Sequence, residues 1–119
     1  MWTYQQQTGK LFAEGGIEVG EGYSGTGIGR NAPDMESVPF VGPCPKGGFL
    51  ISPAYDHPKL GPLTMDLVPD PENEMYGRDE FRIHGDSADH DASEGCIVTA
   101  RAVREIIARH SVLSVVTGT

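Results

Sequence analysis

A histidine and a cysteine stand twelve positions apart in the stretch FRIHGDSADHDASEGCIVTA, residues 81–100. A cysteine attacks as its thiolate, which a neighbouring imidazolium or a helix N-terminus stabilises, and the resulting oxyanion needs backbone N–H donors. His84 ends a predicted strand, Cys96 precedes a predicted helix, and Gly95 lets the backbone approach a substrate. The stretch therefore offers Cys96 as a candidate nucleophile, His84 as its base, and the amides of residues 95–97 as an oxyanion hole.

The loop between His84 and Cys96 is acidic, and its charge acts in two directions. Negative charge favours a protonated imidazole but opposes a thiolate. It can also attract a cationic group on a substrate. The acidic residues are Asp86, Asp89, Asp91 and Glu94.

The residues alone leave three other interpretations open. Free cysteine is among the most buried residue types, so Cys96 can be a packing residue. Zinc accepts histidine, cysteine and carboxylate ligands, but structural zinc sites favour closely spaced pairs, and the sequence has none. A disulfide between Cys44 and Cys96 is the third alternative. The zinc hypothesis uses His84, Asp86, His90 and Cys96, whereas we predict neither a metal nor a cofactor.

The composition limits the class of protein. The chain has 119 residues, of which 38% are hydrophobic and 22% charged, and its formal net charge is -8. These values are typical of one soluble globular domain, here residues 1–119, that buries about two-thirds of its unfolded surface. The acidic balance argues against nucleic acid and provides no basic patch for anionic lipid. We find no signal peptide and no run long enough to insert into a membrane.

Glycines and prolines predict a mainly β fold, a β-rich α+β arrangement of short elements. Sixteen glycines and nine prolines divide much of the chain into pieces too short for helices. Thr8–Gly9 predicts a hairpin turn, and alternating side chains predict strands over 49–52 and within 61–70. The segment 79–85 directs Phe81 and Ile83 towards the core and turns Arg82 and His84 away from it.

Only residues 99–110 have a helical period. Thr99 is the expected N-cap, and a final strand is expected within 111–118. The apolar face of the predicted helix consists of Ala100, Val103, Ile106 and Ile107.

Several stretches, taken in order, resemble the L,D-transpeptidases of the YkuD type. The signature of that family is His-Gly, a spacer, and then Ser/Thr-x-Gly-Cys with an apolar residue, which HGD and SEGCIV match here. GPCPKGGFLI is similar to the stretch that precedes a core strand in that family. WTYQQQTGKL, GYSG with the following RNAP, and GRDEFRIHGD resemble more closely the small type VI secretion L,D-transpeptidase effectors, the Tlde group. The resemblance covers nearly the whole chain.

The resemblance implies a fold and a set of site residues. The fold is a compact, mostly β, L,D-transpeptidase-like domain, in which we expect one C-terminal helix followed by a final strand. Cys96 is implied as the nucleophile and His84 as its base, with Gly85 and Ser93 as motif positions and Gly95 beside the oxyanion hole.

The implied substrate is the stem peptide of peptidoglycan, cut at an L-to-D bond next to meso-diaminopimelate. The acyl-enzyme would pass to water, as in an L,D-carboxypeptidase, or to an amine, giving D-amino acid exchange or cross-linking. Three departures from the family pattern favour hydrolysis or exchange, and one of them is a spacer that is shorter than usual. Glu94 stands where a second histidine is usual, and Val98 stands where an arginine is frequent.

The stem carries an ammonium and carboxylates, which suits an acidic loop flanked by arginines. Arg82 is predicted to bind the terminal carboxylate because it shares the outward face of its strand with His84. The other arginines considered are Arg30, Arg78 and Arg101, and Gly85, Asp86 and Glu94 complete the predicted substrate-binding set.

These inferences predict an antibacterial toxin made in the bacterial cytoplasm without a signal peptide, exported by a secretion machine and active in the periplasm of a target cell. Its expected partners are peptidoglycan stem peptides, a cognate immunity protein and a component of the secretion apparatus. An alternative from another class is a catalytically inactive domain that binds peptidoglycan or serves as a structural phage or secretion component. A zinc-binding module is the remaining alternative.

Overall fold

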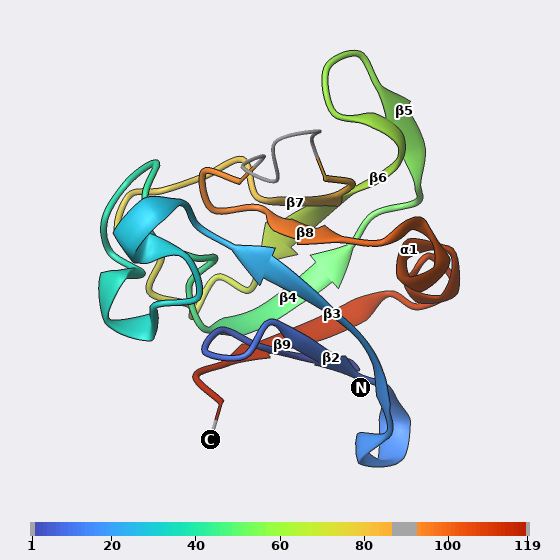
Figure 1. The fold of residues 1–119 in the computed structure, drawn as a ribbon, viewed down its shortest axis with the longest axis horizontal. Coiled ribbons are helices and arrows are strands. Elements are labelled where there is room, and N and C mark those ends of the chain that lie inside the picture. The colour runs from blue at the N-terminus through green and yellow to red at the C-terminus, as the bar shows by residue number, and fades with distance from the viewer. Residues whose placement is uncertain (1, 87–92, 119) are drawn as a thin grey trace.

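The computed structural model describes residues 2–86 and 93–118 (Figure 1). In this part of the chain the fold is mainly β, with a single α-helix followed by a last strand, which confirms the predicted fold class. None of the described helices is long and apolar enough to cross a membrane. The elements are β1 (Trp2–Gln5), β2 (Lys10–Phe12), η1 (Glu14–Gly16), β3 (Glu18–Ser24), η2 (Gly27–Gly29), η3 (Pro33–Met35), β4 (Gly47–Ile51), β5 (Tyr55–His57), β6 (Gly61–Pro69), β7 (Arg82–His84), β8 (Ile97–Thr99), α1 (Arg101–Ile107) and β9 (Val112–Val116).

The sheet closes into a barrel. Its strand order is β4-β9-β1-β2-β3-β8-β7-β6, and β6 returns to pair with β4. The long strand β6 pairs with different strands along its length. Residues 67–69 pair with β4, whereas Gly61 and Thr64 pair with β5. The β5–β6 hairpin projects from the barrel at the top of Figure 1. Every described strand except β5 therefore has a neighbour on both sides.

The core lies inside this barrel and follows the period of the strands. In β1 the buried residues are Trp2 and Tyr4, which align with Leu113 and Val115 of the parallel strand β9. Burial of each such side chain contributes about 1.5–3 kcal/mol. The hairpin between β1 and β2 forms at the predicted turn, where the Gly9 amide donates to the Gln5 carbonyl at 2.8 Å.

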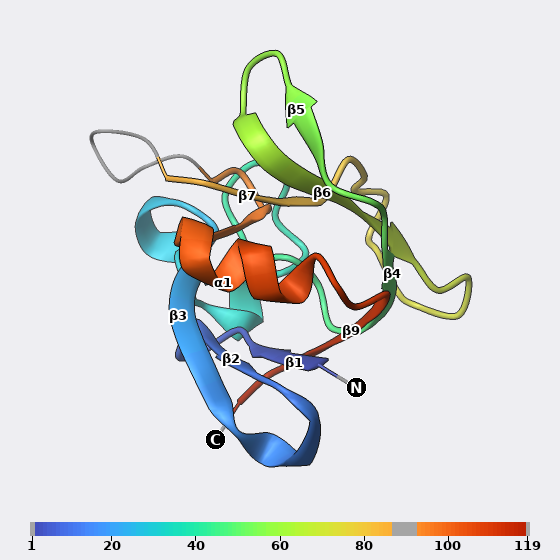
Figure 2. The same ribbon diagram turned by 90° about the vertical axis from the view of Figure 1, so that its right-hand side faces the viewer.

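Helix α1 lies against the barrel (Figure 2), and its start and its buried face differ from the sequence prediction. The N-cap is Ala100, because Thr99 is the last residue of β8. Val103 and Ile107 are buried as predicted, but Ile106 is 43% exposed. The buried face instead includes Arg104, whose guanidinium binds backbone carbonyls.

The neighbouring isoleucines of α1 provide a matched test of this register. We expect Ile107→Ala to lower the free energy of unfolding by about 2–4 kcal/mol, because it removes a fully buried side chain and leaves a cavity. Ile106→Ala is expected to cost less than about 1 kcal/mol, since its side chain is largely solvated. Urea unfolding of both variants measures the difference, and equal losses would contradict the described register.

Candidate active site

The parallel pairing of β7 with β8 places the two reactive side chains on one face. Ile83 aligns with Ile97, and both are fully buried in the core. Neighbouring residues in a strand point to opposite faces, so Arg82, His84 and Cys96 share the face away from those isoleucines. Figure 1 shows β7 and β8 side by side. Cys96 thus precedes a strand rather than the helix, which begins only after β8.

Cys96 and His84 line the same groove, which has a volume of about 580 Å³. The groove contains both charged and apolar walls. Its lining residues are Pro39, Phe40, Leu60, Gly77, Arg78, Asp79, Glu80, Phe81, Arg82, His84, Glu94 and Cys96.

The Cys96 thiol is partly buried and is held by β7 and the residues before it. Its S–H donates to the Glu80 carbonyl at 3.8 Å, and the Arg82 backbone amide bonds to the sulfur. Burial raises the pKa of the thiol, and the Glu94 carboxylate raises it further. The Arg82 amide and the charges of Arg82 and Arg78 oppose these effects without cancelling them. The thiol is therefore protonated at neutral pH.

His84 is oriented by the backbone beside it. Its Nδ1 lies 2.8 Å from the Gly85 carbonyl, which can only accept, so Nδ1 carries the hydrogen and Nε2 keeps its lone pair. The residue lines the groove but is only 1% exposed, so it is more enclosed than the outward strand face predicts. Burial lowers the pKa of the imidazole, and the charge of Arg104 adds to this effect. His84 is thus a neutral base.

These protonation states define how the pair can react. Neither group is charged at neutral pH in the free protein, so the arrangement is not a preformed thiolate–imidazolium pair. A neutral imidazole with a free Nε2 can instead remove the thiol proton as the sulfur attacks.

Ser93 holds the turn that leads to Cys96. Its hydroxyl accepts the amides of Gly25 at 2.9 Å and Gly95 at 3.1 Å, and it donates to the Cys96 carbonyl at 2.6 Å. The Ser24 hydroxyl donates to the Gly95 carbonyl at 3.0 Å. Ser93 is buried and does not line the groove, so its place is that of a support for the turn.

Gly95 occupies a position that only glycine can fill. Its φ is +131°, and a Cβ there would lie 2.5 Å from Arg78 Nη2 and 2.9 Å from the Phe81 ring. Its amide is bound to Ser93, and Ile97 lies within β8. Three amides are predicted for the oxyanion hole. With the Gly95 amide bound to Ser93 and Ile97 in β8, the Cys96 amide is the remaining candidate.

Gly85 lies against a residue that the sequence reasoning missed. A Cβ on Gly85 would lie 2.8 Å from Arg104 Nη2. Arg104 donates to the Thr99 carbonyl at 3.1 Å and to the Pro62 carbonyl at 2.8 Å, so it joins α1, β8 and β6 behind His84. No sequence pattern distinguishes it from Arg101 and Arg109, which are exposed.

The other predicted binding residues lie in two different hollows of the surface. Arg82 and Glu94 line the groove, as does Arg78. Asp86 accepts the Tyr23 hydroxyl at 2.5 Å and lines a second hollow, together with Arg30, whose guanidinium lies over the Tyr23 ring.

The remaining residues discussed above lie away from the groove or outside the described chain. Arg101 is exposed and paired with Glu105 at 3.4 Å. Cys44 is buried and, like Cys96, is a free thiol. Among residues 2–86 and 93–118, no group of three or more histidine, cysteine or acidic side chains could hold a metal ion. His90, Asp89 and Asp91 lie outside the described residues.

Comparison with known families adds to this geometry. The model of the Tlde1 domain matches residues 18–117. The chain belongs to the Tlde1 domain family. Membership implies an enzymatic effector of type VI secretion, an antibacterial toxin with L,D-transpeptidase-like activity. Searches of curated proteins and of solved structures gave no match.

Removing the charge of Glu94 tests how this carboxylate affects the pKa of the Cys96 thiol in this Tlde1 domain. In Glu94→Gln the carboxylate that disfavours a thiolate is gone, so the pKa of Cys96 falls. We expect iodoacetamide to alkylate Cys96 about two to five times faster near pH 7, because the thiolate is the reactive form. Glu72→Gln, in an exposed loop, is the matched control. An unchanged or slower rate in Glu94→Gln would contradict this assignment.

Proposed function

We propose that this Tlde1 domain is a cysteine-dependent enzyme that modifies peptidoglycan tetrapeptide stems through an acyl-enzyme on Cys96. The observation that carries the proposal is the single groove lined by Cys96, His84 and Arg82. The tautomer of His84 supports it, because the lone pair that a base requires is on Nε2.

Acylation begins when the Cys96 sulfur attacks the carbonyl carbon of the L-to-D peptide bond. The thiol proton passes to His84 Nε2, and the carbonyl oxygen becomes an oxyanion, for which the Cys96 amide is the proposed donor. Collapse of this intermediate breaks the C–N bond. The imidazolium then returns its proton to the departing amine of the D-residue, leaving a thioester on Cys96.

Deacylation uses water or a second amine. Water, with its proton taken by His84, gives the shortened stem and a free thiol, which is L,D-carboxypeptidase activity. A D-amino acid amine in place of water gives an exchanged stem. Glu94, exposed at the groove beside the nucleophile, provides a negative charge that suits an ammonium group.

The groove also contains charges that suit both ends of a zwitterionic stem. Arg82 Nε is paired with Asp66 at 3.1 Å, and the Tyr55 hydroxyl donates to the same carboxylate oxygen at 2.6 Å. Arg82 Nη1 also donates to the Glu80 carbonyl at 3.5 Å. We propose that the guanidinium, held in this way, binds a substrate carboxylate in the groove. The acidic groups that line the same groove, and that suit the ammonium of the stem, are Asp79, Glu80 and Glu94.

The proposed setting follows from the substrate and from the family. Peptidoglycan lies in the periplasm, so we propose delivery to that compartment of a target cell by type VI secretion. A component of that apparatus and a cognate immunity protein are the proposed partners. The alternative remains a domain that binds peptidoglycan without catalysis.

Digestion of purified sacculi tests the proposal. We expect the wild type, but not Cys96→Ser, to remove the terminal D-Ala from tetrapeptide stems, as read by mass spectrometry of the muropeptides. Addition of a D-amino acid reports exchange by the mass of the new stem. Identical muropeptide profiles for both proteins would refute the enzyme and favour the binding domain.

Replacement of Arg82 tests the carboxylate contact. We expect Arg82→Ala to lower kcat/KM for tetrapeptide stems about 10- to 100-fold, since a hydrogen bond to a charged group contributes about 1.5–3 kcal/mol. Arg101→Ala, at an exposed arginine outside the groove, is the control. The alkylation rate of Cys96 shows how much of the loss comes from the thiol. Unchanged turnover in Arg82→Ala would remove this residue from the substrate site.

A further inference from the structure

Arg78 lies behind the turn that carries the nucleophile and is only 9% exposed. Its guanidinium donates only to backbone carbonyls among the described residues. Nη1 donates to Glu36 and, at 2.9 Å, to Pro43, while Nη2 donates to Gly42 at 3.0 Å and to Glu94 at 3.3 Å. One side chain thereby joins the segment that follows η3 to the turn before Cys96.

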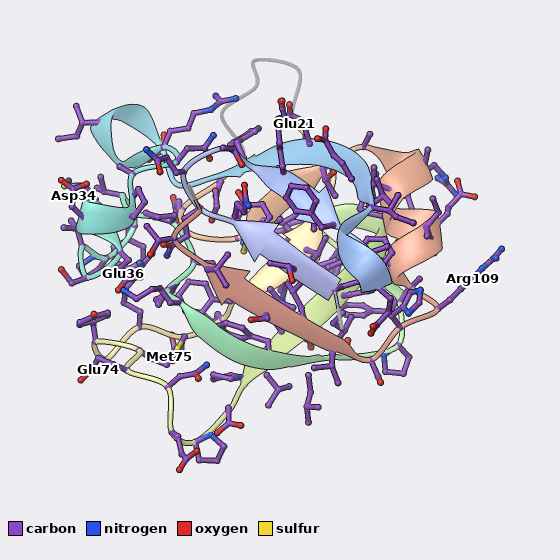
Figure 3. All side chains as sticks on the ribbon, turned by 90° about the horizontal axis from the view of Figure 1, so that it is seen from below. Glu21, Asp34, Glu36, Glu74, Met75 and Arg109 are labelled. Atoms are coloured by element: carbon purple, nitrogen blue, oxygen red, sulfur yellow. The ribbon has the colours of Figure 1, made fainter. Side chains whose placement is uncertain are left out.

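The Glu36 carboxylate, whose charge raises the pKa of Arg78 through space, has its hydrogen bonds with other groups. Glu36 offers its carbonyl to Arg78, whereas its carboxylate accepts Gln6 Nε2 at 2.8 Å, Lys46 Nζ at 2.9 Å and the Tyr76 hydroxyl at 2.9 Å. Figure 3 shows Glu36 close to the loop that carries Met75. Within the described chain, Arg78 therefore forms no ion pair, and its positive charge is not neutralised by contact with a carboxylate.

The same guanidinium lies against the turn itself. Nη2 is so close to Gly95 that a Cβ there would come within 2.5 Å, and the guanidinium carbon lies 5.1 Å from the centre of the Phe81 ring. Arg78 and Cys96 both line the groove. The charge is thus buried beside the nucleophile rather than at a remote packing site.

Burying a charge without a counter-ion costs several kcal/mol, and an apolar side chain can often fill such a space more favourably. Burial accordingly lowers the pKa of the Arg78 guanidinium. The four carbonyls provide hydrogen bonds but no opposite charge. A cation that contacts no carboxylate can stabilise an anion that forms only during a reaction.

We propose that Arg78 is a positioning residue that fixes the Glu94–Cys96 turn and whose charge stabilises negative charge as it develops on the Cys96 sulfur. The first role needs the planar fork of the guanidinium, and the second needs only a positive charge. The second role does not depend on the proposed substrate, because ionisation of the thiol is measured without peptidoglycan. Its contribution to attack on a stem peptide during turnover rests on the proposed function.

Other charged and titratable groups also face the sulfur. Arg82 on β7 contributes its amide and its charge, and Glu94 opposes both. Cys44 is close enough for its thiol to be coupled electrostatically to Cys96. His84 and Glu80 line the same groove. All of these groups are kept unchanged in the experiment, so that any difference comes from residue 78.

The experiment compares wild type with Arg78→Gln, Arg78→Lys and the control Arg101→Gln. Glutamine removes the charge, lysine keeps it but loses the fork, and residue 101 is an exposed arginine outside the groove. For each protein, thermal unfolding and circular dichroism establish that it folds. The readouts are the ratio of the iodoacetamide rate near neutral pH to the rate in alkali, where the thiol is fully ionised, and turnover of tetrapeptide stems.

We expect folded Arg78→Gln to lower this ratio about three- to tenfold, because less thiolate is present near neutral pH. Arg78→Lys is expected to keep the ratio within about twofold of wild type but to lose about tenfold or more in kcat, since an ammonium cannot hold four carbonyls. Arg101→Gln leaves both readouts unchanged.

A wild-type ratio in folded Arg78→Gln would overturn the electrostatic role. If Arg78→Gln does not fold, Arg78→Lys decides, because a ratio lowered more than about threefold in a variant that keeps the charge contradicts the proposal. Wild-type turnover in Arg78→Lys would overturn the positioning role. Failure of the wild type to process stems would refute the proposed function, while the alkylation ratios would still test whether Arg78 stabilises the thiolate.

Discussion

The pairing of β7 with β8 is the constraint on which the candidate site depends. The register that aligns Ile83 with Ile97 places both isoleucines in the core and leaves Arg82, His84 and Cys96 on the opposite face. A shift of one residue would bury the thiol in the barrel and expose an isoleucine. The register is therefore fixed by the same apolar burial that stabilises the barrel, and the reactive groups need no separate device to choose their face.

The groove combines charges of both signs within an acidic chain. The net charge is -8, yet two guanidinium groups, those of Arg78 and Arg82, lie beside a thiol that a carboxylate and burial keep protonated. Such a balance keeps the nucleophile as a thiol, the less reactive form, in the absence of substrate. The charges of Arg82 and Arg78 act in the other direction and favour the anion that forms during attack.

Local patterns predicted those elements that local forces decide. The β1–β2 hairpin, the presence of a strand at residues 82–84 and the existence of α1 all follow from turn residues or periodicity, whereas the predicted outward exposure of His84 is wrong. Strand β8 escaped prediction because its three residues are all buried and so have no period. Cys96 and His84 were found because their motif is short in sequence, whereas Arg78 and Arg104 act through carbonyls up to 42 residues away, which no local pattern indicates. The enclosure of His84 likewise comes from distant segments that form the groove walls.

The parallel partner of β1 is β9, and β9 also pairs with β4. On the ribosome, β1 emerges about a hundred residues before the strand that completes its pairing, so contacts of very long sequence separation must form last. Until residues 112–116 are available, the edges of β1 and β4 that pair with β9 are unpaired, so strands of other chains can pair with them. Barrel closure is thus a step that follows synthesis of the last strand, and a nascent chain has to be protected from aggregation during that interval.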